Sequence, residues 1–330
     1  MPAPIIFIHK GDSDYLQHTM KCAKLFNPEK EVVLLGDKEN EHLKSLGIKH
    51  ELIEDYNKSS ELEVFNKVYQ FVAGPEHGKS EWTKFVFERW YIMYNFITKN
   101  DIHQFWTFDS DNLIIGKLST KEAAYSKYDC TAQCLGICMN GWVSNQKVVH
   151  GYLLKMNELF EREEYLNRQR QDFELNPHYA FTEMRAFEAY RAEENITVFR
   201  INEILHQEAF DECIACTHHN MKMSPFKIND VAIKELYTDN NGFIYSFYTS
   251  TKQYIRLNNL NISWLPLYVY DRLLSAALPS IGKEFDHLKF DYNTIKQIDL
   301  APSRDFVKKN LKAKRKQKLY KIYSSIFRKN

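Results

Sequence analysis

Two carboxylates separated by one residue, Asp109 and Asp111, follow directly after the apolar segment 104–108. That segment is typical of a buried strand, which would place both acids in the loop at its carboxyl end. Carboxylate oxygens bind a hard divalent cation such as Mn²⁺ or Mg²⁺ and leave coordination positions free for a diphosphate. The cation can then neutralise charge on a departing diphosphate. Since such pairs also occur by chance, the alternative is that both acids only cap the following segment.

The elements that would position these acids begin with an alternation of strands and helices. In order, these segments are residues 4–9, 15–26, 31–37, 40–46 and 50–53. The alternation predicts an α/β fold with a Rossmann-like, doubly wound and mostly parallel sheet and flanking helices. Ligands bind such sheets beyond the carboxyl ends of the strands, so His9, Asp12 and Tyr15 are expected at the mouth of a site.

Further elements are expected on both sides of the acidic pair. A strong helix is predicted over residues 81–98, a strand over 130–138, and mainly helical structure over 147–194. Neither the G-x-G-x-x-G pattern of dinucleotide sites nor a G-x-x-x-x-G-K-[ST] phosphate loop occurs in the sequence. The sequence therefore offers neither of these two phosphate-binding patterns.

The acidic motif, its preceding strand and the Arg89-Trp90 helix together resemble the DXD glycosyltransferases of the GT-A fold. More specifically, the chain is similar to bacterial sugar transferases that open with strand–His–x–Gly–Asp, here residues 7–12. Their second strand ends in Leu-Gly-Asp, here residues 35–37. The resemblance covers roughly residues 4–255. It implies metal-dependent transfer of a sugar from a nucleotide sugar, expected to be UDP-linked, to a glycan or lipid-linked acceptor.

The resemblance also implies a donor site built from the opening strand and the acidic pair. Asp111 would chelate the cation, which is expected to be Mn²⁺ or Mg²⁺. Asp109 would contact the donor ribose, the sugar or a metal-bound water. His9, Asp12 and Tyr15 would lie beside the base or the ribose.

Three other residues have possible roles. Glu183 lies in Thr-Glu-Met, where similar enzymes have Ser-Asp-Met near the acceptor, so it is a candidate general base or acceptor anchor. Arg89 could reach the donor phosphates, since a guanidinium suits phosphate, or it could form a structural ion pair. Trp142 could stack on an acceptor sugar or belong to the core.

One element departs from the pattern of similar chains, which carry a late His-Phe-Gln-Gly-x-x-Lys. The matching stretch, residues 246–252, keeps Lys252, which would meet the donor phosphate, but begins with Ser246, a poor metal ligand. Water is one candidate for the third ligand. The histidines that could take its place are His206, His218 and His219.

Length and charge suggest two parts. We divide the 330 residues into a GT-A-like nucleotide-sugar-binding catalytic domain, 1–255, and a C-terminal helical extension, 256–330. Residues 304–329 carry 11 Lys or Arg and one acid, a net +10, so a total of +1 leaves the remainder at −9. That remainder is a poor nucleic-acid binder. The tail, with an apolar stripe from residue 307 to 326, could form a basic amphipathic helix that touches an anionic membrane or packs on the acidic body.

Cysteine usage and the N-terminus bear on the compartment. No secretory signal is visible, so we expect a cytoplasmic protein with reduced thiols. If the basic tail touches the membrane, the protein would lie peripherally on its inner face. Cys213 and Cys216 with two following histidines could bind zinc, although buried cysteines in a loop are the simpler interpretation. Two other functions remain open. One is a nucleotidyltransferase, and the other is a non-catalytic protein that binds a nucleotide sugar.

Overall fold

The computed structural model describes residues 2–215, 220–303 and 306, and it contains a central seven-stranded sheet. The strand order is β3-β2-β1-β4-β7-β6-β8, and only β7 runs against the other six. The strands are β1 (Ile5–Ile8), β2 (Val32–Gly36), β3 (Lys49–Leu52), β4 (Phe105–Thr107), β6 (Cys130–Gln133), β7 (Cys138–Val143) and β8 (Val198–Arg200). The expected mostly parallel α/β sheet is confirmed.

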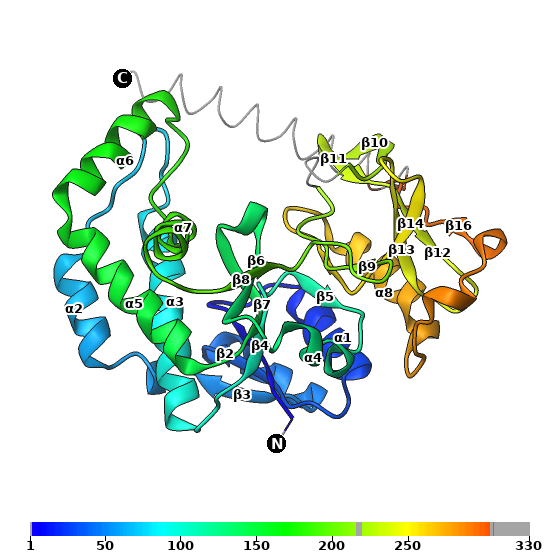
Figure 1. Cartoon of the computed structure of the whole chain (residues 1–330), viewed down its shortest axis with the longest axis horizontal. Helices are drawn as coiled ribbons and strands as arrows, with labels where there is room; N and C mark the ends of the chain where they lie inside the picture. The colour runs from blue at the N-terminus through cyan, green and yellow to red at the C-terminus, as the bar shows by residue number, and fades with distance from the viewer. Residues whose placement is uncertain (1, 216–219, 304–305, 307–330) are drawn as a thin grey trace, which may run out of the picture.

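Helices cover both faces of this sheet (Figure 1). Their bounds are α1 (Leu16–Phe26), α2 (Ser60–Val68), α3 (Ser80–Lys99), α4 (Glu122–Tyr125), α5 (Gln146–Glu161), α6 (Glu163–Leu175), α7 (Glu183–Glu193) and α8 (Leu267–Ala277). Successive residues of a strand point to opposite faces. In β1, Ile6 and Ile8 therefore join the core beneath α3 and α5, while Ile5 and Phe7 join the core beneath α1. A strand that is apolar throughout is the sequence signature of this two-sided burial.

Local signals explain where several elements begin and end. The segment expected as a helix at 40–46 forms a 3-10 helix, η1 (Lys38–Leu46). It begins after Asp37, because the Asp37 side chain accepts a hydrogen bond from the Glu39 N–H. The prediction of a single strand over 130–138 is wrong. Cys134, Leu135 and Gly136 all have positive φ and form the turn η4 (Cys134–Gly136), which separates β6 from β7.

A second sheet lies on the other side of the molecule (Figure 1). Its order is β16-β12-β13-β14-β9, with a separate hairpin of β10 and β11. The bounds are β9 (Glu208–Ala209), β10 (Met223–Ile228), β11 (Val231–Lys234), β12 (Leu236–Thr238), β13 (Ile244–Tyr248), β14 (Gln253–Leu257) and β16 (Lys296–Gln297). Position 255, where we divide the sequence, falls within β14. Within 256–303 the extension contains α8 together with strands, and the basic segment from 307 lies outside the described residues.

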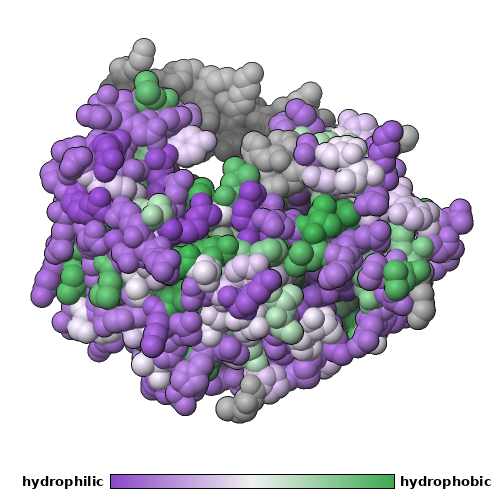
Figure 2. All heavy atoms as spheres, viewed as in Figure 1, coloured by the Kyte–Doolittle hydropathy of each residue, from purple (hydrophilic) through white to green (hydrophobic). Residues whose placement is uncertain are grey.

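Between the helical side and the five-stranded sheet, the face shown in Figure 2 is hollowed, and apolar side chains gather within it. The short strands β5 (Asn112–Ile114) and β15 (Asn259–Asn261) pair antiparallel and connect the two sides. No helix in the described part of the chain is long and apolar enough to cross a membrane.

Candidate functional site

The acidic motif occupies the loop between β4 and β5, as the sequence predicts. Asn112 shapes this loop, because its backbone N–H and its side-chain amide both donate to the Asp109 carbonyl, at 3.1 and 2.9 Å. On the far side, the Ile262 N–H donates to the Asp111 carbonyl at 3.0 Å. The loop is therefore fixed by its own strand and by the segment that follows β15.

Asp109 belongs to a three-residue charge network. Arg89, from α3, donates through Nη1 to Asp109 Oδ1 at 2.6 Å and through Nη2 to Glu183 Oε1 at 2.8 Å. Glu183 is buried at the first turn of α7. Burial raises the pKa of Glu183 to about 7, against the opposing effect of Arg89. Burial lowers the pKa of Arg89, but the two carboxylates outweigh that effect and raise it above its ordinary value.

Asp111 lies in a different environment. The Ser263 hydroxyl lies 2.6 Å from Asp111 Oδ2 and also 2.6 Å from Asn261 Oδ1. The Ser263 N–H donates to that same Asn261 atom at 3.1 Å, which identifies it as the amide oxygen. The single hydroxyl proton of Ser263 cannot be donated fully to Asp111 Oδ2 and Asn261 Oδ1 at once, so one of these two oxygens lies against the Ser263 oxygen without that proton. Burial, reinforced by Asp109, raises the pKa of Asp111 to about 6.

This oxygen cluster suits a hard cation. Divalent Mg²⁺ and Ca²⁺ take carboxylate, amide and hydroxyl oxygens, and Mn²⁺ shares that preference. Asp111, Asn261 and Ser263 supply all three kinds of oxygen, and the Ser263 hydroxyl lies within hydrogen-bonding distance of both the carboxylate and the amide oxygen. Among the described residues there is no group of three His, Cys, Asp or Glu that could hold a metal. A cation here would thus rest on one or two carboxylates and on neutral oxygens.

The opening strand ends beside the motif. His9 hydrogen-bonds through Nδ1 to the Ser110 hydroxyl at 2.8 Å and through Nε2 to the Ser13 hydroxyl at 3.1 Å. Burial lowers the pKa of His9, although Asp37 and Asp12 act in the opposite direction. His9 therefore joins the loop after β1 to the loop after β4.

Tyr15 and Asp12 border an open cavity on the α8 side. The Tyr15 ring lies edge-on to His9 and stacks on Tyr270, with ring centres 5.4 Å apart and an angle of 13°. The cavity has a volume of about 370 Å³. Its lining residues are Asp12, Ser13, Asp14, Tyr15, Leu265, Leu267 and Tyr270. Aromatic and apolar walls with a few polar groups are typical of a small-ligand site.

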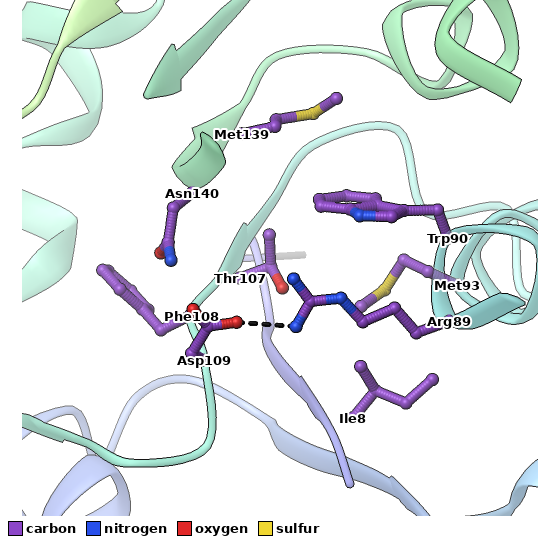
Figure 3. Close-up of a pocket in the computed structure, with 9 residues that line it drawn as sticks. All are labelled: Ile8, Arg89, Trp90, Met93, Thr107, Phe108, Asp109, Met139 and Asn140. Atoms are coloured by element: carbon purple, nitrogen blue, oxygen red, sulfur yellow. Dashed lines mark hydrogen bonds and ion pairs between the residues drawn. The ribbon is translucent and has the colours of Figure 1, made fainter. Parts of the chain in front are cut away.

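A second, narrower cavity lies behind Asp109 (Figure 3). It is lined by Ile8, Arg89, Trp90, Met93, Thr107, Phe108, Asp109, Met139 and Asn140. Three buried polar atoms of this lining have no hydrogen-bond partner among the described residues: Arg89 Nε, Trp90 Nε1 and Asn140 Oδ1. Burying such groups unpaired costs free energy, and the cavity, at about 10 Å³, has room for one water-sized polar group that could pair with them.

The structure places the predicted site residues in three different locations. Five of them are linked around the motif by hydrogen bonds or electrostatic interactions: His9, Arg89, Asp109, Asp111 and Glu183. Asp12 and Tyr15 border the adjoining cavity. By contrast, Lys252 occupies an exposed turn between β13 and β14, in the other sheet, and the Ser246 side chain is buried in β13.

The other metal candidates lie elsewhere or cannot be placed. The His206 ring is 5.9 Å from the His287 ring, in the turn before β9. Cys216, His218 and His219 fall outside the described residues. Trp142 is buried in β7 and packs against Trp106, so it is a core residue and not an acceptor platform.

Sequence reasoning missed the residues that support the loop from behind. Asn259 donates to Asn112 Oδ1 at 2.6 Å and accepts from the Asp211 N–H at 2.6 Å. Lys234 pairs with Asp211 at 2.5 Å, and both side chains are almost completely buried. The available signal was the run of asparagines at 258, 259 and 261 within an apolar stretch. Such a run has no reason to be buried unless it hydrogen-bonds within the protein.

Comparison with known proteins does not identify the function of this chain. No protein-family model matches the chain, and no curated protein matches it. A solved structure described as PaToxG glycosyltransferase is similar over 59% of this chain and 88% of that one, with 10% identity and a TM-score of 0.31. A likeness at that score carries no argument about function. The fold and site define an α/β protein with an oxygen-rich acidic loop beside two cavities.

Proposed function

We propose that this protein is a glycosyltransferase that binds a nucleotide sugar with the help of a divalent cation. One observation carries the proposal. The acidic loop adjoins a cavity in which three buried polar atoms of Arg89, Trp90 and Asn140 have no partner in the described part of the chain. The cavity, at about 10 Å³, admits a group the size of one hydroxyl, so a sugar bound at the loop would reach these atoms by inserting a single hydroxyl group, which can both donate and accept.

The proposal assigns the nucleotide to the larger cavity. Its aromatic wall, Tyr15 stacked on Tyr270, offers a flat surface beside which a base can lie. The diphosphate would then pass the acidic loop, where Asp111, Asn261 and Ser263 would hold Mn²⁺ or Mg²⁺. When bound, the cation supplies positive charge that stabilises the departing nucleoside diphosphate. UDP is the nucleotide we expect.

Arg89 and Glu183 have a positioning role in this proposal. Arg89 holds Asp109 through one nitrogen and is itself held by Glu183 through another, so the Asp109 carboxylate faces the cavity in a fixed orientation. Because Glu183 is buried and paired, we propose that it fixes the guanidinium and does not remove a proton from the acceptor. The acceptor is expected to be a glycan or a lipid-linked sugar.

Nucleotide binding tests the proposal. Binding of UDP, GDP and CDP should be titrated calorimetrically with and without Mn²⁺ on wild type and on Asp111→Ala. The control is Asp101→Ala, which removes an exposed carboxylate from the turn before β4. Metal-dependent binding of one nucleotide, lost only in Asp111→Ala, supports the assignment. Equal binding by both variants would show that Asp111 does not hold the cation, and the proposed metal site would be rejected.

Hydrolysis separates an enzyme from a binding protein. With the nucleotide identified, the matching nucleotide sugars should be incubated with Mn²⁺, and release of free sugar and nucleoside diphosphate should be followed by chromatography. Slow metal-dependent release, lost in Asp111→Ala, is the expected result. Tight binding without any release, with or without candidate acceptors, would instead favour a non-catalytic protein.

A further inference from the structure

A cluster of large apolar side chains is exposed at one edge of the helical side. Phe71 is 43% exposed, Trp82 52%, Tyr179 60% and Leu175 84%. Single exposed apolar residues are common, but a group of neighbouring ones marks an interaction surface. We call these four residues the aromatic rim.

Contacts of His77 bring together the three chain segments that carry Phe71, Trp82 and Tyr179. The His77 ring lies 6.1 Å from the Phe71 ring. One ring nitrogen bonds the hydroxyl of Thr83, the residue after Trp82, at 3.1 Å. The other bonds the carbonyl of His178, the residue before Tyr179, at 2.9 Å.

Backbone contacts fix the same arrangement. The Gly74 N–H donates to the Tyr179 carbonyl at 2.9 Å, and Ala73 and Ala180 form an isolated β-bridge. At Gly74 a side chain would overlap the backbone of Pro177, so only glycine permits this close approach. The segments that carry Phe71 and Tyr179 are thus held side by side by specific backbone contacts.

The rim is continuous with the candidate site. Trp82 and Arg89 are seven residues apart on α3, which places them on the same helix face, separated by roughly 10 Å along the axis. Tyr179 precedes Glu183, the first residue of α7, by four positions. Figure 1 shows the start of α3 and the α6–α7 connection together on the helical side. A ligand that reaches Arg89 from this side would pass over the rim.

We propose that the aromatic rim binds the acceptor, and that the acceptor carries a lipid chain next to the sugar or hydroxyl that receives the transferred residue. This inference rests on the proposed glycosyltransferase function. Phe71 and Leu175 have no polar atoms in their side chains, so they gain from contact with an apolar group and little from contact with a hydrated glycan. Trp82 and Tyr179 pair a large apolar face with one polar atom, which suits the junction between an apolar group and a sugar.

Binding of simple glycosides tests the inference on the full chain. Octyl and methyl β-glucosides and β-galactosides should be titrated calorimetrically, below the micelle concentration, with UDP and Mn²⁺ present. We expect the octyl compounds to bind at least tenfold more tightly than the methyl compounds. Trp82→Ala should abolish most of that difference. Leu175→Ser, at an exposed helix end that tolerates a polar residue, provides a second variant if the first is poorly folded.

The control is Tyr292→Ala, a 50% exposed tyrosine on the side of the five-stranded sheet. This variant should keep the preference for octyl compounds, while UDP binding with Mn²⁺ should be unchanged in all three variants. Equal affinities for octyl and methyl compounds in wild type, or equal loss in the control, would overturn the inference. Absence of UDP binding with the octyl preference intact would instead reject the glycosyltransferase proposal.

Two other occupants would also contradict the inference. If residues 307–330 cover the rim, truncation after Pro302 should make Trp82 more accessible to acrylamide quenching, measured against Trp82→Phe. If a second copy covers it, sedimentation should show a dimer that Trp82→Ala dissociates. Either result assigns the rim to the protein itself and not to an acceptor.

Discussion

Replacing Glu183 with glutamine should make the protein more stable relative to wild type as the pH rises. Glutamine keeps the shape of the side chain and an oxygen that can accept from Arg89, but it cannot ionise. The folded protein raises the pKa of Glu183 from an ordinary 4.5 to about 7, chiefly through burial. The folded state therefore binds this proton more tightly than the unfolded state does. Its stabilising effect is complete below about pH 4.5 and is lost as the pH rises through about 7.

The size of the effect follows from the pKa values. At about 1.4 kcal/mol for each pH unit, ionising Glu183 in the folded state costs about 3.4 kcal/mol once both states are ionised. Between pH 5 and pH 8 the difference in free energy of unfolding, variant minus wild type, should rise by about 2.5 kcal/mol. Since Arg89 stays paired with Asp109 in the variant, the absolute difference at low pH should be small.

Urea denaturation at half-unit steps from pH 5 to pH 8 measures this difference. Glu188→Gln, on the exposed side of the same helix, controls for general effects of removing a carboxylate from α7. The control should give a line nearly independent of pH. A flat difference for Glu183→Gln would refute the reasoning. If the variant is also less stable than wild type by a constant amount from pH 5 to pH 8, Arg89 outweighs burial and keeps Glu183 ionised.

Three further predictions concern the site and its support. Mn²⁺-dependent nucleotide binding should weaken about tenfold for each pH unit below about 6, because Asp111 must lose its proton to hold a cation; calorimetry at pH 5, 6 and 7 checks this. Trp90→Phe keeps the ring but removes the unpartnered N–H, so affinity for the nucleotide sugar should fall about tenfold while that for the nucleotide is unchanged, by competition titration. Lys234→Met should cost about 3–5 kcal/mol in urea denaturation by leaving Asp211 buried and unpaired, and Lys234→Met with Asp211→Asn should recover most of it.

The sequence predicted those parts of the site that depend on local order. An apolar strand followed by Asp109-Ser110-Asp111 has its acids at the carboxyl end whatever the rest of the chain does, and the same holds for His9 after β1. Arg89 was expected to meet either donor phosphate or a carboxylate. In the structure it bonds two carboxylates, Asp109 and Glu183.

What the sequence did not predict comes from distant pairing. Ser263 and Asn261 reach Asp111 only because β15 pairs with β5 across nearly 150 residues, and no periodicity in either segment encodes that pairing. Lys252 was expected at the donor phosphate because it matches the last residue of the His-Phe-Gln-Gly-x-x-Lys pattern. The first residue of that pattern, His, is already replaced by Ser246 in this chain. The turn that carries Lys252 joins two strands of the second sheet, so its position depends on how the sheets pack and not on local sequence.

The two acids of the motif are chemically unequal, and this inequality organises the proposed site. Asp109 has a strong cationic partner in Arg89, so its charge is largely balanced within the protein. Among the described residues, the Asp111 carboxylate has a hydroxyl and an amide as hydrogen-bond partners and no direct ion pair, and repulsion from Asp109 adds to the effect of burial in raising its pKa. A cation that arrives near the loop gains most by approaching Asp111, since that is where negative charge is least compensated. In the proposed site, Asp109, held by Arg89, would orient the sugar, while Asp111, Asn261 and Ser263 would hold the metal.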